Sequence, residues 1–178
     1  MIHILHSRRV FTGLIFVVLA AVSSTAFAQT PDAGTRLPVS NKYVVSANPF
    51  LLMAEYGNVE FERKHTDSAT FGLSASNSGF DGADYRNFQA FYRYYPQGAS
   101  LTGFFIGGRG GVHRVSEAGE SDHAYGLGFE LGYGWLFGKE RNFAVSLGAG
   151  ATRLFGGDIG GGSVFVPTLR LVNIGWSF

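Results

Sequence analysis

The sequence predicts an all-β protein, a transmembrane, up-and-down antiparallel β-barrel of eight strands. Three observations predict it. Segments of about ten residues alternate between large apolar side chains and small or polar ones, the pattern of barrel strands that cross a bilayer. The 178 residues include 26 glycines and 17 phenylalanines but no cysteine. The chain also ends on Ile174, Trp176 and Phe178, the spacing of side chains on one face of a strand.

The N-terminus predicts export. Arg8 and Arg9 precede an apolar run that ends at an A-x-A motif, residues 26–28, and this is the pattern of a cleaved signal peptide over residues 1–28. The alternative, a permanent membrane anchor, needs a longer run. Cleavage removes two arginines and no acid, so the formal net charge changes from +1 to −1 and gives no basis for nucleic-acid binding. Without cysteine there is no disulfide or thiolate site.

The mature chain reads as a short polar lead-in, residues 29–41, followed by the barrel over residues 42–178. Its strands are expected within residues 42–52, 58–64, 69–77, 86–96, 102–114, 123–138, 142–153 and 167–178. The first upward strand, 42–52, with a reversal at 54–57, is required to make the strand count even, as it is in bacterial single-chain barrels.

The clearest strand is HAYGLGFELGYGWLFG, residues 123–138. Every second residue is large and almost always apolar, and the residues between are mostly glycine. A strand of a soluble sandwich would carry larger polar groups on its outer face. We therefore expect the large face to meet lipid, so Leu131→Asp should block assembly, whereas Gly132→Ala should be mild.

Connection lengths predict the orientation. HTDS, PQGAS and GKERN are compact, as periplasmic turns are, and alternate with SEAGESD and GGDIGGG, which read as outer loops. Aromatic residues gather at the predicted periplasmic ends and form an expected girdle: Tyr94, Tyr95, Phe104, Trp135, Phe137, Phe143, Trp176 and Phe178. Arg170 falls on the outward register of the last strand, which is tolerable only near the outer interface.

The terminal aromatic residue resembles the C-terminal signature by which outer-membrane barrels are recognised for assembly. The layout resembles small eight-stranded outer-membrane barrels of the OmpA and OmpX type. NVEFERK, FYRYYP, GFFIGGRGG, LGFELGYGWLFG and PTLRLVNIGWSF resemble a bacterial barrel family of uncharacterised function. The resemblance implies a monomer in the outer membrane of a Gram-negative-type cell, in contact with lipid and lipopolysaccharide, that meets the assembly machinery through its last strand and Phe178.

Five charged residues are expected to point into the lumen: Glu60, Glu62, Arg93, Arg109 and Glu130. Side chains fill the interior of an eight-stranded barrel, and an unpaired buried charge is costly, so we expect an ion-pair network that ties strands together. The alternative is a narrow pore whose conductance depends on Arg93 or Arg109.

The segment around the predicted loop 115–122 offers two weaker sites. His113, His123, Glu117, Glu120 and Asp122 could hold a metal ion, but their spacing matches no metal signature, so no metal or cofactor is expected. Ser121 and His123 share the outward face, as in barrels that remove or add acyl chains of lipid A, with Glu117 or Glu120 orienting the histidine. The deacylases of this type have the histidine before the serine. The sequence therefore favours a non-catalytic, structural or surface-interaction role.

Overall fold

The computed structural model describes residues 40–80, 83–117, 120–156 and 164–178. The predicted signal peptide lies outside these ranges, as does nearly all of the predicted lead-in. Among the described residues, no helix is long and apolar enough to cross a membrane.

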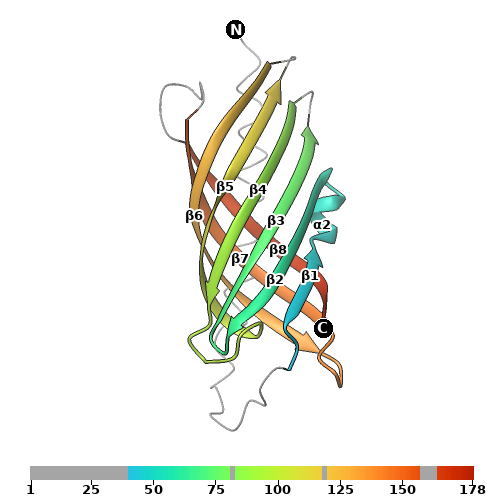
Figure 1. Cartoon of the computed structure of the whole chain (residues 1–178). Helices are drawn as coiled ribbons and strands as arrows, with labels where there is room; N and C mark the ends of the chain where they lie inside the picture. The colour runs from blue at the N-terminus through green and yellow to red at the C-terminus, as the bar shows by residue number, and fades with distance from the viewer. Residues whose placement is uncertain (1–39, 81–82, 118–119, 157–163) are drawn as a thin grey trace, which may run out of the picture. The chain divides into compact units, whose positions relative to one another are not determined.

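Eight antiparallel strands form a closed barrel in which each strand pairs with the next in sequence and the last pairs with the first (Figure 1). The strands are β1 (Tyr43–Ala47), β2 (Tyr56–Thr66), β3 (Ala69–Phe80), β4 (Ala83–Tyr94), β5 (Gly103–Glu117), β6 (Glu120–Phe137), β7 (Phe143–Phe155) and β8 (Val164–Ser177), and the helix α2 (Pro49–Leu52) follows β1. The predicted eight-stranded, up-and-down barrel is confirmed.

The first hairpin differs from the prediction. The expected strand over residues 42–52 ends at Ala47, and one helical turn, α2, follows it before β2 begins at Tyr56. Asn48 accounts for the change, because its side-chain oxygen accepts hydrogen bonds from the backbone of Phe50 and Leu51 and so caps a helix start. Pro49 then stands at the first helical position, where its missing N–H costs nothing.

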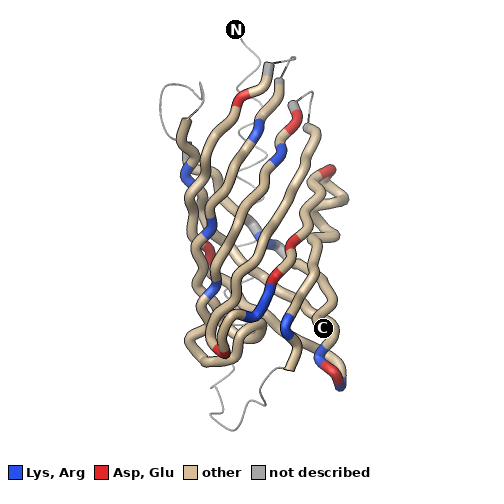
Figure 2. Tube along the Cα trace, viewed as in Figure 1, with Lys and Arg blue, Asp and Glu red and all other residues tan. Residues whose placement is uncertain are grey.

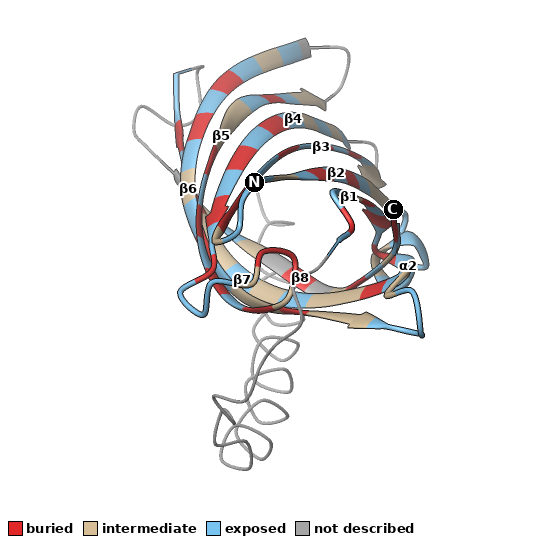
Figure 3. Cartoon of the chain, turned by 60° about the horizontal axis from the view of Figure 1, so that its bottom comes forward, coloured by how far each residue is buried: buried red, intermediate tan, exposed pale blue. Residues whose placement is uncertain are grey.

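Buried and exposed residues alternate along the strands (Figure 3). The outward positions carry large apolar side chains that are more than a third exposed, among them Val59, Phe61, Leu73, Phe88, Ile106, Val112, Leu127, Phe129, Leu131 and Ile174. The inward positions carry small, polar and charged groups that are largely buried. This inverts the usual arrangement of a water-soluble protein, in which apolar side chains collect inside.

The last strand contains an irregularity that the sequence prediction missed. Ser146 pairs with Asn173, but Gly148, two residues along β7, pairs with Arg170, so β8 has one extra residue between these positions. An inserted residue of this kind is a β-bulge, and it reverses which face the following residues occupy. The prediction that Arg170 faces outward is therefore wrong: its side chain is buried in the lumen.

Short turns close the end of the barrel that carries Phe178, which we call the short-turn end. Phe137, Phe143 and Trp176 lie in one row across β6, β7 and β8, and the rings of Phe137 and Phe143 are 6.2 Å apart. In the turn after β2, the hydrogen bond and charge of Lys64, whose Nζ is 2.7 Å from Asp67 Oδ1, lower the pKa of the Asp67 carboxyl.

The predicted girdle residues lie at this end with their side chains at least partly exposed, apart from Tyr95. Tyr95 was expected in the girdle, but its side chain is buried and reaches the lumen. It follows the inward-facing Arg93 by two positions, so strand alternation carries it to the same face.

Candidate functional site in the barrel lumen

Arg93, on β4, is the centre of a charged cluster in the lumen. Its side chain is completely buried, and each guanidinium nitrogen meets a different carboxylate. Nε lies 2.5 Å from Glu130 Oε1, Nη2 lies 3.1 Å from Glu60 Oε2, and Nη1 pairs with Glu62. Arginine suits this position because its planar group presents several donors in fixed directions.

Two further arginines complete the cluster. Arg109 Nη2 lies 3.2 Å from Glu130 Oε2 and 3.8 Å from Glu60 Oε1, and Arg170 Nη2 pairs with Glu60. The amide oxygen of Asn173, turned toward Arg170, accepts hydrogen bonds from Nε at 3.0 Å and from Nη2 at 3.3 Å. Among the described residues, the cluster thus joins three arginines to three glutamates, and their formal charges cancel.

Charge balance matters because burial strips water from each ion. The loss of hydration is offset only where the geometry is good and the remaining polar atoms have partners. Glu62 meets this condition, since it also accepts hydrogen bonds from Thr70 at 2.6 Å and from Tyr95 at 2.8 Å. The cluster links β2, β4, β5, β6 and β8 through side chains, in addition to the backbone hydrogen bonds between neighbouring strands. Figure 2 shows charges of both signs along the barrel wall.

Aromatic rings flank the central guanidinium. The carbon Cζ of Arg93 lies 3.9 Å from the ring centre of Phe91 and 4.9 Å from that of Phe105. A cation near the face of an aromatic ring is stabilised electrostatically. Gly72 and Gly132 make room for these rings, because a Cβ at Gly72 would overlap Phe91 and one at Gly132 would overlap Phe105. The expectation that Gly132→Ala is mild therefore conflicts with the packing.

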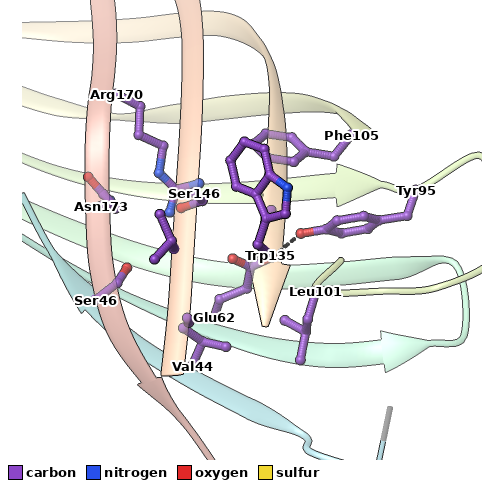
Figure 4. Close-up of a pocket in the computed structure, with 13 residues that line it drawn as sticks. Val44, Ser46, Glu62, Tyr95, Leu101, Phe105, Trp135, Ser146, Arg170 and Asn173 are labelled. Carbon is purple, nitrogen blue, oxygen red and sulfur yellow. Dashed lines mark hydrogen bonds between the residues drawn. The ribbon is translucent and has the colours of Figure 1, made fainter. Parts of the chain in front are cut away.

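Between the cluster and the short-turn end, side chains fill the lumen. A cavity of only about 20 Å³ remains there, and the buried residues that line it include Val44, Tyr95, Leu101 and Phe105. That volume holds about one water molecule. The side chain of Tyr95 reaches toward Glu62 (Figure 4). Toward the opposite end, buried His113 is hydrogen-bonded to Tyr85 at 2.5 Å and to Gln89 at 3.0 Å.

The five charged residues that the sequence placed in the lumen thus lie together. Sequence reasoning missed Arg170. The inward and outward faces of the last strand were assigned by taking every second residue back from Phe178, and the extra residue of the bulge reverses that assignment before Arg170. Tyr95 shares the inward register of Arg93, as strand alternation predicts, although it was also expected in the aromatic girdle. Thr70 was predictable in principle, since it is two residues before the inward-facing Gly72.

The weak catalytic candidates are not arranged as a catalytic pair. Ser121 Oγ is hydrogen-bonded to Ser116 Oγ at 2.8 Å and accepts from Arg114 at 3.0 Å. Ser121 and His123 are both exposed, and among the described residues no hydrogen bond joins their side chains. The side chains of Glu117 and Glu120 lie outside the described part of the chain.

The candidate metal ligands are separated. His113 points into the lumen and His123 is exposed on the outer face, so the barrel wall lies between the two imidazoles. Asp122 Oδ1 accepts a hydrogen bond from the backbone of His123. Within the described residues, no group of three or more histidines and acids is placed to hold a metal ion.

Neither a family model nor a curated protein matches the chain. The fold is similar to the crystal structure of the N-terminal β-barrel domain of Pseudomonas aeruginosa OprF. The two share 16% sequence identity, the match covers 78% of this chain and 98% of that one, and the TM-score is 0.47. A likeness at this level assigns no role to any residue.

Proposed function

We propose that this chain is an integral outer-membrane barrel with a structural or surface-interaction role, and that it neither catalyses a reaction nor forms an open channel. One observation carries the proposal: the charge-balanced cluster around Arg93 joins five strands across the lumen, and the buried side chains between it and the short-turn end line a cavity of only about 20 Å³. A lumen filled in this way stiffens a barrel and leaves its outer surface and loops as the parts that meet other molecules.

The outer surface supports a membrane location. An apolar belt surrounds the described barrel, and an aromatic row that includes Phe137, Phe143 and Trp176 borders it at the short-turn end. This matches the band and girdle of outer-membrane barrels. Because every strand pairs with two neighbours, most backbone groups are satisfied without water, as hydrocarbon requires.

The expected partners follow from this location. We propose that outer-membrane lipid and lipopolysaccharide surround the barrel, that it is a monomer, and that the assembly machinery recognises β8 and Phe178. The closure of the barrel gives Phe178 a structural task as well. Its carbonyl oxygen accepts hydrogen bonds from the backbone of Lys42 and Tyr43, both at 2.9 Å, so the last residue secures the first strand.

Two measurements test the proposal. Membrane fractionation should place the full chain in the outer membrane, whereas Leu131→Asp should prevent its accumulation there, because this exposed side chain lies in the apolar belt. Purified barrel in a planar lipid bilayer should show no steady conductance. A steady ion current from the unaltered chain, lost or altered in Arg109→Gln, would instead support the narrow pore.

A further inference from the structure

The barrel wall has an incomplete seam between its first and last strands. β1 pairs with β8 over four residue pairs only, from Val44–Ser177 to Ala47–Ile174. Beyond Ala47 the chain leaves the wall as α2. Among the described residues, β2 before Val59 therefore pairs with β3 alone, and β8 before Ile174 pairs with β7 alone. Unpaired strand edges are costly in hydrocarbon, so this seam needs a cover.

A groove of about 640 Å³ lies at the seam, where α2 meets the wall. The residues that line it include Asn48, Leu52, Val59, Ala75, Asn77 and Ile174. Phe50, Leu52 and Met53, on and just after α2, expose more than half of their surface. The groove and the helix beside it thus present apolar surface on the outside of the barrel.

Asn48 places one polar group at this groove. Its side chain is only 2% exposed, and its Oδ1 accepts hydrogen bonds from Phe50 N at 3.1 Å and Leu51 N at 3.0 Å. These two bonds fix the orientation of the amide, because Nδ2 in the same place could not accept them. Nδ2 is therefore a buried donor, and it has no partner among the described residues. An unmade bond of this kind is unfavourable, which suits a ligand that brings an acceptor.

The groove also spans the outer boundary of the apolar belt. Val59 and Ala75 are outward and form a cross-strand pair, and the next outward residue on β3 is Asn77. Asn77 Oδ1 accepts a hydrogen bond from Arg86 Nε at 3.0 Å. Apolar residues and Asn48 thus line the groove, and the guanidinium of Arg86 is hydrogen-bonded to Asn77 of the same lining.

The cation has a like-charged neighbour. Arg86 stands directly opposite Arg114 on β5, and both are exposed. Among the described side chains, no carboxylate pairs with either guanidinium. Like charges placed opposite each other across strands are destabilising, and a bound anion would relieve the repulsion.

We propose that the groove holds one acyl chain of an anionic membrane lipid. The carbonyl oxygen where the chain joins the head group accepts a hydrogen bond from Asn48 Nδ2, and the phosphate lies beside Arg86. The apolar lining, the donor of Asn48 and the cation of Arg86 match the acyl chain, the ester carbonyl and the phosphate of such a lipid. The proposal rests on the membrane location proposed above.

Photolabelling of the full chain in vesicles tests this. The vesicles are phosphatidylcholine with a small fraction of phosphatidylglycerol that carries a diazirine on its acyl chain. We expect excess label on residues 47–59 relative to the apolar face of β6 around Phe129, which faces ordinary lipid. Asn48→Ser keeps a neutral cap but lacks Nδ2, and it should lower the excess about fivefold, the effect of one hydrogen bond.

Two further variants complete the design. Ala75→Phe should fill the groove and abolish the excess. Arg86→Gln should lower the excess for phosphatidylglycerol but not for a diacylglycerol that carries the same diazirine, because the diacylglycerol has no phosphate. The proposal is overturned if the unaltered chain shows no excess, or if Ala75→Phe retains it. An Asn48→Ser chain that also loses label on β6 has failed to insert into the vesicles. In that case the result for Ala75→Phe decides whether the groove binds the acyl chain. Label on neither face of the unaltered chain would overturn the membrane location as well.

Discussion

Arg93 on β4 and Glu130 on β6 form an ion pair at 2.5 Å although β5 runs between their strands. Gly107 makes this possible, because it stands directly between them, as the register partner of Arg93 on one side and of Glu130 on the other. A Cβ at Gly107 would lie 3.0 Å from Glu130 Cγ and 3.2 Å from Arg93 Cγ. A missing side chain on one strand thus allows two charges on its neighbours to meet.

Gly107→Leu should therefore destabilise the folded barrel. The added side chain would occupy the space in which the ion pair forms, and overpacking of this kind costs about 1–3 kcal/mol. Equilibrium unfolding in urea, with the barrel in detergent micelles, measures the change. Gly108→Ala is the matched control, since a Cβ there meets nothing within 4 Å. Equal stability of the two variants would contradict the role given to Gly107.

The charge balance of the cluster predicts a strong coupling between Arg93 and Glu130. Arg93→Met leaves three buried carboxylates short of one cation and should cost about 3–5 kcal/mol, as the removal of one partner of a buried pair does. Adding Glu130→Gln to Arg93→Met should restore part of the loss. A double-mutant cycle from urea unfolding gives the coupling energy. Additive effects would show that the two groups act independently.

Gly132→Ala should slow or prevent folding, contrary to the expectation from the sequence. Its Cβ would overlap the buried ring of Phe105 and the backbone oxygen of Leu147, and the backbone oxygen is fixed by the strand. The fraction of heat-resistant folded barrel on a cold-loaded gel measures the effect, with Gly108→Ala as reference. Folding yields that match the reference would indicate that the lumen is packed more loosely.

Arg170→Leu distinguishes the inward position of Arg170 from the outward one. On the lipid-facing side, leucine would be neutral or favourable. In the lumen it removes one of the cations that pair with Glu60 and the donor to Asn173, so we expect a loss of about 3–5 kcal/mol. Glu60→Gln in the same chain should recover part of it. Unchanged or raised stability in Arg170→Leu would argue against the bulge in β8.

Ser121→Ala should leave the lipid A of the outer membrane unchanged. Ser121 is hydrogen-bonded to Ser116 and Arg114 rather than to a histidine that could activate it. Mass spectra of lipid A from cells that overproduce the unaltered chain, the variant, or neither should be the same. If a lipid A species that has lost or gained an acyl chain appears with the unaltered protein and disappears with Ser121→Ala, an acyl-transfer or hydrolase activity would be assigned to the site around Ser121.

The sequence by itself determined the strands and the faces of most of their residues. Alternation with a period of two is a local property of an extended chain, so it places Glu60, Glu62, Arg93, Arg109 and Glu130 inside without knowledge of any neighbour. Only the tertiary structure decided which of these charges meet, because partners depend on the register between strands. The contact of Arg93 with Glu130 needs Gly107 in the same row, which no single segment reveals.

The two errors, in the first and last strands, arise where a local feature interrupts the alternation of side chains. One extra residue in β8 changes the face of Arg170, and that residue is visible only when β8 is aligned with β7. The cap made by Asn48 ends β1 early, which leaves the seam and its groove. The bulge depends on how β8 pairs with β7, whereas the cap is a local hydrogen-bonding arrangement of Asn48 that the alternation of side chains does not reveal.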